Sequence, residues 1–355
     1  MISDELIALV RCPECRGALE GIAETGSLRC RACGRAFSAP AGEYLDLRPA
    51  GGFAEQTKYL DEALHADARH ERVSPPLLGS KIRNDMLRTF LRPGPGDLVV
   101  DLGCGSGRAL VWNRDWRAHT VGVDIAPFFS VDAMREVDLL LADLRTLPLA
   151  AGTFTKAYSL DVLEHLSPEA LRGMLAEASR ILEPGGALFV YTHVRKNARI
   201  AKGLRLINRF AQWLDRRGLV DLRQEHLRKS DHLNPLADIP ELERVTCDAG
   251  FRIARIRYYT PLVGGFVENV MVRMAERALA KRAAREMTVG HHGSTQAIDV
   301  DARAIKEART AAKQQIARSP ATYAALRTLS FAMKLDLLLF GRITSGPFFA
   351  LLIKD

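Results

Sequence analysis

A turn with three glycines directly after a buried strand constrains the fold of this chain more than any other segment. The apolar strand is expected at Asp97–Asp101, and it is followed by Gly103, Gly105 and Gly107. Glycine permits positive φ and lets a ligand approach the backbone, and a helix that begins after such a turn favours a negative group at its N-terminus. The spacing is GxGxG, whereas dinucleotide-binding turns have GxGxxG.

Strands and helices alternate around this turn. Helices are expected at Lys81–Leu91 and Pro168–Leu182. Further strands are expected at Thr120–Asp124, Asp138–Ala142, Thr155–Leu160 and Ala187–Thr192. This alternation implies an α/β fold, with a mostly parallel sheet and helices on both of its faces.

Three successive strands of this pattern end in a carboxylate. These residues are Asp101, Asp124 and Asp143. Asp124 is placed to accept hydrogen bonds from both hydroxyls of a ribose, and Asp143 to accept one from an exocyclic adenine amine. Three carboxylates would repel a pyrophosphate, so they indicate an adenosyl ligand without phosphate; each could also serve as a helix N-cap.

The combined motifs resemble the class I S-adenosylmethionine-dependent methyltransferases. The matching segments are VVDLGCGSG, VGVDIA, LADLRTLPLAAGTFTKAYSLDVLEHL and RILEPGGALFVYT. The resemblance implies a Rossmann-like seven-stranded mixed sheet with one antiparallel strand, and S-adenosyl-L-methionine as the cofactor. It implies that Gly103, Gly105 and Gly107 line the methionine part and that Asp101 lies near its amino group. It further places Asp124 and Ile125 at ribose and adenine, Asp143 and Leu144 at the adenine edge, and Leu160 near the sulfonium.

The same resemblance organises the rest of the chain. Pro240–Gly250 resembles the last helix of the family, and Phe251–Tyr258 and Phe348–Lys354 resemble its sixth and seventh strands. The resulting division is a ribbon module at 1–48, a linker with a helix around Glu55–Arg72 at 49–80, and a methyltransferase domain at 81–262 plus 346–355. Two helical insertions, 194–238 and 263–345, interrupt that domain.

Four of the six cysteines form two CxxC pairs near the start of the chain. They are Cys12, Cys15, Cys30 and Cys33. Two such turns can close a tetrahedral shell of four thiolates, which suits a structural zinc ion with no open position. The alternatives are two disulfides or a redox pair; the absence of a secretion signal disfavours the first, and a redox motif would need one CxxC beside a βαβ unit.

The segment around these cysteines, about residues 6–48, resembles the Trm112-like zinc ribbons that precede some bacterial methyltransferase domains. A similar ribbon opens the guanine-N1 methyltransferases of the large ribosomal RNA. Both resemblances imply that the ribbon belongs to a methyltransferase.

Candidates for catalysis lie beyond the fourth and fifth strands. A methyl transfer from a sulfonium depends mostly on alignment, and a base is needed only for a hydroxyl or an acidic carbon. His165 is the first candidate base, followed by His193, and then by His226 and His232; packing or capping roles are the alternative for each. Asp161 and Glu164 could fix the site instead.

The acceptor is inferred from the charge distribution. The net charge is +8, and residues 195–230 alone carry 11 Lys/Arg against 3 Asp/Glu. In this stretch Ile200, Leu204, Ile207, Ala211 and Leu214 recur on one helical face, with Lys202, Arg205, Arg209 and Arg216 opposite. Such a helix can lie on an anionic membrane surface, or its stripe can pack on the domain or on a second copy of the chain in a homodimer.

The sequence therefore predicts O- or C-methylation of a small-molecule or lipid-like acceptor, such as a quinone or a lipid-linked compound. Nucleic acid is the less favoured partner, because the ribbon carries 6 Lys/Arg and 7 Asp/Glu over residues 1–50. The alternatives are a ribosomal RNA guanine-N methyltransferase and a non-catalytic, methyltransferase-like partner protein. No signal peptide and no apolar run of about 20 residues is found, which favours the cytoplasm, with the inner face of the membrane as a second location.

Overall fold

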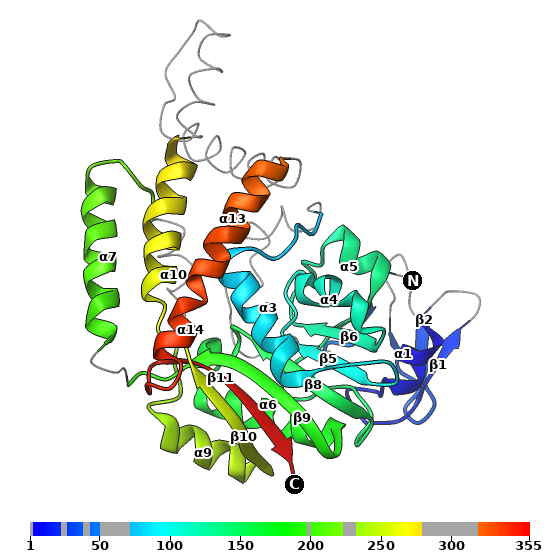
Figure 1. Ribbon diagram of the computed structural model, residues 1–355. Helices are drawn as coiled ribbons and strands as arrows, with labels where there is room; N and C mark the ends of the chain where they lie inside the picture. Colours follow the sequence, from blue (N-terminus) through cyan, green and yellow to red (C-terminus); the bar gives the residue numbers. More distant parts are fainter. Residues whose placement is uncertain are drawn as a thin grey trace, which may run out of the picture.

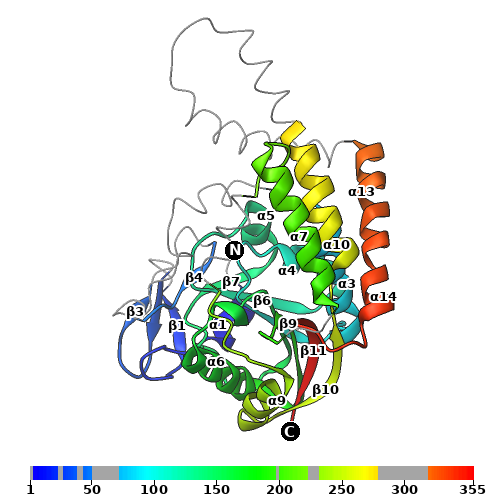
Figure 2. The same ribbon diagram turned by 90° about the vertical axis from the view of Figure 1, so that its left-hand side faces the viewer.

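A large mixed β-sheet forms the centre of the molecule in the computed structural model, which describes residues 3–22, 27–37, 43–49, 72–196, 200–222, 232–278 and 319–355 (Figures 1 and 2). The strand order among these residues is β10-β11-β9-β8-β5-β6-β7-β4. The strands are β4 (Leu45–Asp46), β5 (Leu98–Leu102), β6 (His119–Asp124), β7 (Asp138–Leu141), β8 (Phe154–Leu160), β9 (Leu182–His193), β10 (Phe251–Tyr258) and β11 (Pro347–Lys354). β11 is antiparallel to both of its neighbours, and the ladders from β9 to β4 are parallel. The predicted Rossmann-like seven-stranded mixed sheet is confirmed, and β4 extends it by one short strand.

Helices cover both faces of this sheet. One face carries α3 (Leu78–Leu91), α4 (Arg108–Trp112), η4 (Arg114–Trp116) and α5 (Val131–Glu136), and the other carries α6 (Pro168–Ile181) and α9 (Ile239–Asp248). Neighbouring residues of a strand point to opposite faces, so Val99 and Tyr158 pack with the first group and Val100 and Ala157 with the second. The strands are accordingly apolar on both sides, as expected of a covered parallel sheet.

The N-terminal module is packed against the β7 edge of the sheet. It consists of α1 (Asp4–Leu9) and a small antiparallel sheet of β1 (Leu19–Ile22), β2 (Ser27–Cys30) and β3 (Ala36–Phe37). Its β4 pairs in parallel with β7, and the main chain of Leu9 and Arg11 is hydrogen-bonded to Ala150 and Pro148. Through β4, the last strand of the predicted ribbon, the module becomes part of the large sheet.

Helices from the two predicted insertions stand side by side beyond the end of β9. They are α7 (Ala201–Arg216), α10 (Leu262–Phe266), the π-helix η6 (Val267–Val272), α13 (Pro320–Met333) and α14 (Leu335–Phe340). Figures 1 and 2 show α7, α10 and α13 as neighbours in both views. The side-chain carboxylate of Asp336 accepts hydrogen bonds from the N–H groups of Leu262, Val263 and Gly264, and so joins α14 to the first turn of α10.

The apolar stripe of α7 does not face a membrane. Ala211 and Leu214 are buried against Val270 of η6, and Ile207 packs on the same cluster. The prediction of an anionic membrane surface as partner of this stripe is therefore corrected, because the stripe is already covered by the second insertion. No helix among the described residues is long and apolar enough to cross a membrane. Phe331, Leu338 and Leu339 of α13 and α14 are exposed.

Two further expectations concern element boundaries. The helix expected at Pro168–Leu182 is α6, which ends at Ile181, and residues 183–186 that follow lie inside β9, where the register with β8 shifts between Phe154 and Lys156. A bulge of this kind accommodates extra residues on one strand. The linker helix around Glu55–Arg72 falls almost entirely outside the described residues, and His226 also lies outside them.

Candidate functional site

The three glycines form a left-handed turn between β5 and α4. Gly103, Gly105 and Gly107 have φ of +86°, +54° and +75°. A Cβ on Gly103 would lie 2.4 Å from Val162, and one on Gly107 would lie 2.5 Å from Ala133, so close packing excludes side chains at both positions. A Cβ on Gly105 would meet nothing within 4 Å, and this glycine borders open space above the strand ends. The turn thus has the shape expected of a cradle for a ligand that contacts the backbone.

Two of the predicted carboxylates flank this turn. Asp124, at the end of β6, accepts hydrogen bonds from the N–H groups of Gly105 (2.7 Å) and Ala126 (3.0 Å), and burial raises its pKa. Asp101, on β5, is 2% exposed, and burial raises its pKa well above the usual range. A buried carboxylate of this kind is stabilised by a cationic group, which an amino group of a ligand would provide. Ile125 follows Asp124 and is partly buried.

The third carboxylate has a partner that the sequence analysis did not foresee. Asp143 is 8% exposed and receives hydrogen bonds from the main chain and the guanidinium of Arg145, with Nη2 of Arg145 2.6 Å from its Oδ2. Leu144 and Leu160 are partly buried at the ends of β7 and β8. All of these predicted residues lie at the carboxyl ends of parallel strands, where open α/β sheets bind their ligands.

A cluster of imidazoles and one carboxylate lies beyond the ends of β8 and β9. Glu164 and His165 belong to the 3₁₀ turn η5 (Leu163–His165), and His193 is the last residue of β9. His232 comes from the segment before α9, and its ring centroid lies 4.7 Å from that of His165 and 5.4 Å from that of His193. The structure therefore brings together both predicted catalytic histidines and His232.

Glu164 is the buried member of this cluster. It is 3% exposed, and its Oε2 accepts a hydrogen bond of 2.9 Å from the hydroxyl of Thr192. Its Oε1 lies 4.0 Å from Nδ1 of His193. Burial, together with the negative charge of Asp161, raises the pKa of Glu164 to about 7.

Asp161, the third predicted catalytic residue, is held by a residue that the sequence analysis missed. Asp161 has a left-handed backbone (φ 56°), which is uncommon for a residue with a side chain. Its Oδ2 lies 3.2 Å from Nε of Arg83 on α3, and the Arg83 guanidinium lies 5.6 Å from the ring centroid of Tyr191. Nearby Asp161 raises the pKa of Arg83 against the effect of burial, so this arginine stays charged. No spacing rule marks Arg83, because helix α3 and the end of β8 meet only in the fold.

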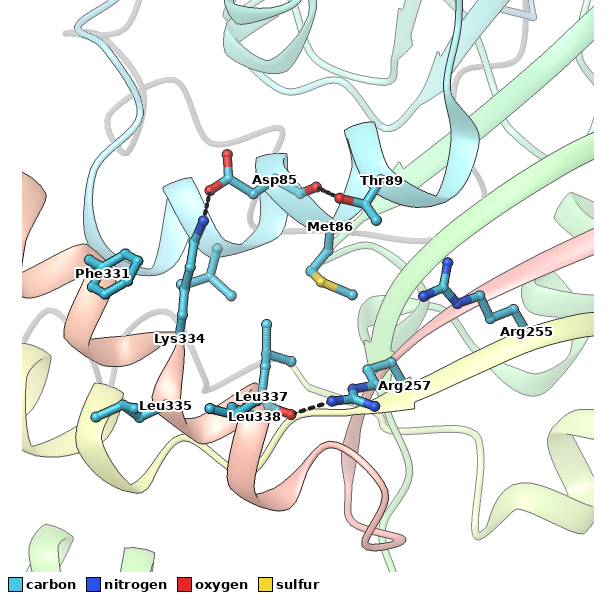
Figure 3. Close-up of a pocket in the computed structure, with 11 residues that line it drawn as sticks. Asp85, Met86, Thr89, Arg255, Arg257, Phe331, Lys334, Leu335, Leu337 and Leu338 are labelled. Atoms are coloured by element: carbon cyan, nitrogen blue, oxygen red, sulfur yellow. Dashed lines mark hydrogen bonds and ion pairs between the residues drawn. The ribbon is translucent and has the colours of Figure 1, made fainter.

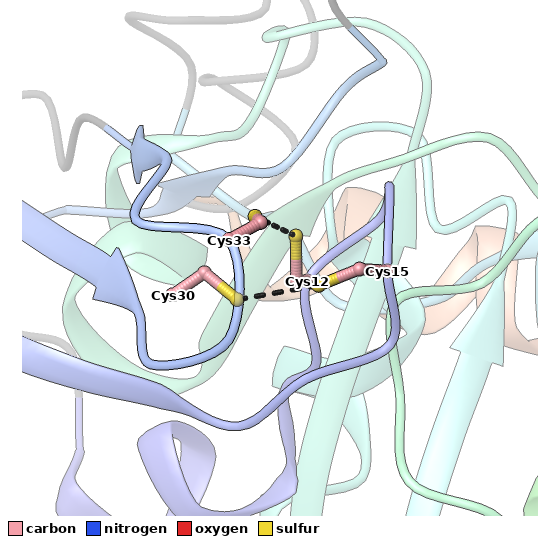
Figure 4. A group of neighbouring side chains, drawn as sticks. All are labelled: Cys12, Cys15, Cys30 and Cys33. Atoms are coloured by element: carbon pink, nitrogen blue, oxygen red, sulfur yellow. Dashed lines mark hydrogen bonds between the residues drawn. The ribbon is translucent and has the colours of Figure 1, made fainter.

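The four cysteines of the N-terminal module converge (Figure 4). The Sγ atoms of Cys12 and Cys33 are 3.8 Å apart, those of Cys15 and Cys30 are 3.4 Å apart, and all four lie within 4.8 Å of one another. Tetrahedral zinc with Zn–S bonds of about 2.3 Å requires sulfur separations of about 3.8 Å. All four cysteines are free thiols, which speaks against the disulfide alternative.

A groove between α3, β10 and the α13–α14 corner has a volume of about 490 Å³ (Figure 3). It is lined by Arg255, Arg257 and Lys334 and by apolar side chains that include Met86 and Leu337. Lys334 is 2.7 Å from Asp85, and Arg257 donates to the carbonyl of Leu337. None of the predicted site residues lines this groove.

The outward face of α7 combines cations with aromatic rings. Lys202, Arg205, Arg209 and Arg216 are exposed. Phe210 and Trp213, 43% and 42% exposed, stack with an interplanar angle of 17°, and Arg217 lies 4.0 Å above the Trp213 ring. We call the face formed by these seven residues the α7 face.

Two family models match the chain. Residues 100–190 match the family described as methyltransferase domain, and residues 3–38 match the family described as Trm112p-like protein. Together with the strand order and the glycine turn, these matches define the class: the chain carries a class I S-adenosylmethionine-dependent methyltransferase domain preceded by a Trm112-like module.

Among curated proteins, the chain is similar to tRNA methyltransferases. A probable tRNA methyltransferase 9B of Mus musculus is 34% identical over 147 residues, which cover 40% of this chain and 32% of that protein. The tRNA (carboxymethyluridine(34)-5-O)-methyltransferase ALKBH8 of Mus musculus is 30% identical over 105 residues, covering 29% of this chain and 16% of that protein. The match thus spans about a third of the first relative and less of the second.

A solved complex of the Haloferax volcanii Trm112 methyltransferase activator with a methyltransferase is also similar. It has a TM-score of 0.39 and 20% identity, and the match covers 57% of this chain and 80% of that one. A likeness at this level carries no inference about function.

The prediction of a small-molecule or lipid-like acceptor is wrong, and so is the prediction that nucleic acid is the less favoured partner. The named relatives that overturn both are tRNA methyltransferases. The charge of the N-terminal module was a poor guide to the acceptor, because this module docks at the β7 edge, whereas the predicted catalytic histidines lie beyond β8 and β9.

Proposed function

We propose that this protein transfers a methyl group from S-adenosylmethionine to RNA, with tRNA as the first candidate. The named relatives support this proposal through the part of the chain that they share. The α7 face is the observation in the structure that supports it most directly.

The α7 face has the two chemical properties that RNA binding requires. Its cations can neutralise phosphates, which supplies a large, salt-dependent part of the affinity. Its stacked Phe210 and Trp213 can receive unpaired bases, whose stacking on an aromatic ring contributes about 1–3 kcal/mol per base. Because the apolar stripe of α7 is packed on η6, the basic and aromatic side remains available to a partner.

The donor site follows from the residues around the glycine turn. Asp124 would accept the ribose hydroxyls, Asp101 would face the amino group, and Gly103, Gly105 and Gly107 would let the methionine part approach the backbone. Ile125, Asp143 and Leu144 would surround the adenine, and Leu160 would lie near the sulfonium. S-adenosylmethionine supplies a methyl group that is already activated for displacement, so the main task of the protein is alignment.

The groups beyond β8 and β9 would serve the acceptor. His165 and His193 can take a proton from a hydroxyl or nitrogen of the acceptor as the new bond forms. Asp161 would position the acceptor together with Arg83, whose Nε lies 3.2 Å from Oδ2 of Asp161.

The N-terminal module would hold one structural zinc ion through Cys12, Cys15, Cys30 and Cys33. The sulfur separations fit this metal, and a module of about 40 residues can rarely build a sufficient core without one. We retain the division into a module at 1–48, a linker at 49–80, a domain at 81–262 plus 346–355 and insertions at 194–238 and 263–345 as part of the proposal.

Methyl incorporation from labelled S-adenosylmethionine into purified tRNA, ribosomal RNA and a sample without RNA tests the proposed function. We expect incorporation into tRNA, and at least a tenfold loss of tRNA affinity in the double variant Arg205→Glu/Arg209→Glu. The control Arg244→Glu/Arg252→Glu makes the same charge change at exposed residues of α9 and β10, and should bind tRNA as the wild type does. No incorporation into tRNA, or equal losses in both double variants, would refute the proposal.

A further inference from the structure

The cluster beyond β8 and β9 has the composition and spacing of a metal site. The carboxylate of Glu164 and one ring nitrogen each of His165 and His232 lie within 4.8 Å of one another. Metal–ligand bonds of about 2.1 Å place neighbouring ligands about 3–3.5 Å apart, so small side-chain rotations would complete the geometry. The geometry points to a second metal site in this protein, in which Glu164, His165 and His232 bind one divalent transition-metal ion.

The backbone already holds the three residues in register. Glu164 and His165 are adjacent in η5, whose turn is closed by a hydrogen bond of 2.9 Å from the N–H of His165 to the carbonyl of Val162. The segment that carries His232 is joined to η5 by a hydrogen bond of 2.9 Å from the N–H of Asn234 to the carbonyl of Glu164. Residues far apart in the sequence are thus fixed at one place before any ion binds.

The carboxylate is oriented by a neighbour, as metal-binding carboxylates usually are. Thr192 donates its hydroxyl proton to Oε2 of Glu164, which leaves Oε1 directed to the side where His193 lies. Supporting hydrogen bonds of this kind fix ligand geometry, and their loss typically weakens metal binding 10- to 100-fold.

The donor set indicates the class of ion. Two imidazoles and one carboxylate suit manganese, iron, cobalt or zinc, whereas calcium and magnesium prefer oxygen ligands throughout. Three protein ligands also leave at least one position open, which is the arrangement of catalytic metal sites and differs from the closed four-thiolate shell of the N-terminal module.

The location indicates what the open position would hold. Val162, two positions before Glu164, packs against Gly103 of the glycine turn. The cluster therefore lies next to the donor site. An ion there would coordinate an oxygen or nitrogen atom of the acceptor and fix it near the methyl donor. This role rests on the proposed function, whereas the binding of the ion does not. With His165 held as a ligand, the role of proton acceptor would belong to His193.

Cobalt(II) added to the protein loaded with a single equivalent of zinc per chain, which the four thiolates take up, tests this inference without donor or RNA. Equilibrium dialysis should show one Co²⁺ per chain, and the visible spectrum should contain d–d bands without a thiolate-to-cobalt charge-transfer band. Cobalt binds such sites more weakly than zinc, so it should not displace zinc from the thiolates. The isosteric variant Glu164→Gln and the variant His232→Ala should each lower Co²⁺ affinity at least tenfold. Glu169→Gln, an exposed carboxylate in the first turn of α6, is the matched control and should bind as the wild type does.

Absence of Co²⁺ uptake by the wild type would overturn the inference, and so would unchanged affinity in both ligand variants. In that case the cluster is a hydrogen-bonded group of side chains that acts without an ion. Because uptake is measured without RNA, a protein that binds Co²⁺ but methylates no tRNA would refute only the proposed function. Conversely, a tRNA methyltransferase that takes up no Co²⁺ would refute only the metal site.

Discussion

The residues of the candidate site come from two kinds of position: strand ends at one edge of the sheet, and elements that only the fold brings there. Asp101, Asp124 and the three glycines could be predicted, because a strand followed by a turn places them at one sheet edge whatever the rest of the chain does. The positions of Arg83 and His232 in the site could not be predicted. Arg83 lies on a helix before the first predicted strand, and His232 lies in a segment of an insertion. Their positions depend on tertiary packing, for which local spacing holds no signal.

Asp124 carries the sharpest prediction at the donor site. Asp124→Ala should weaken S-adenosylmethionine binding by more than tenfold, because it removes the predicted acceptor of the ribose hydroxyls and the anchor of the Gly105 N–H. Titration calorimetry measures the affinity, with Asp248→Ala at the exposed end of α9 as the control. Unchanged affinity in a folded Asp124 variant would remove this residue from the donor site.

A pH dependence of stability is expected from His119 and Asp138. They form an ion pair of 2.7 Å, and the hydrogen bond that His119 donates to Asp138 raises the pKa of His119. Hydrogen bonds from His119 and Ser3 lower the pKa of Asp138 despite its burial. The His119 contribution is complete below its unfolded pKa of about 6.5 and is lost as the pH rises through the higher folded pKa. The Asp138 contribution is present above its unfolded pKa of about 3.9 and is lost as the pH falls through the lower folded pKa.

The pair should therefore stabilise the protein most between about pH 4 and 6.5. The unfolding free energy measured by urea denaturation from pH 4 to 9 should decline above this window in the wild type. In His119→Gln the decline should be smaller. Parallel pH profiles for the two proteins would show that the pair makes no such contribution.

Whole elements were predicted more reliably than their surroundings. The amphipathic period of α7 identified the helix and its apolar stripe, because a period of 3.6 residues is a local property. The period could not tell whether a lipid, a second chain or another helix covers that stripe. The structure places the stripe on η6, a π-helix from the second insertion. The strands of the sheet were also predicted. The bulge in β9 was not, because it depends on how β9 pairs with β8.

The packing of α7 gives a prediction for this element. Leu214→Ala should lower the free energy of opening of α7 by about 2–5 kcal/mol, because a side chain that is 5% exposed leaves a cavity when it is truncated. Leu206→Ala on the same helix is the control, since Leu206 is 69% exposed and its truncation should cost less than about 0.5 kcal/mol. Hydrogen exchange of the α7 amides measures both, and equal effects would mean that the stripe is not held by η6 in solution.

One of the buried core clusters joins the N-terminal module to the methyltransferase domain. Leu6, Val10 and Leu45 of the module belong to the same buried cluster as Leu149 and Val121 of the domain. Ser3 donates to Asp138, and Arg16 donates to the carbonyl of Leu147. The two sequence resemblances indicated both parts, but the extension of the sheet by β4 was not foreseen, because two residues of strand carry too little pattern to identify their partner.

This shared core predicts that loss of zinc destabilises the methyltransferase domain as well as the module. Cys30→Ser should remove the one zinc ion expected in the four-cysteine site and unfold the module, which in turn removes β4 from β7 and uncovers the core around Leu149. The amide of Ala150 should then exchange faster, because it loses its hydrogen bond of 2.8 Å to the carbonyl of Leu9. The melting temperature of the whole protein should fall as well. Elemental analysis, hydrogen exchange and thermal unfolding measure the three effects, with Cys247→Ser at an exposed cysteine as the control. A wild type without zinc would contradict the metal assignment, and an unchanged Ala150 amide in zinc-free Cys30→Ser would show that the module stays docked without its metal.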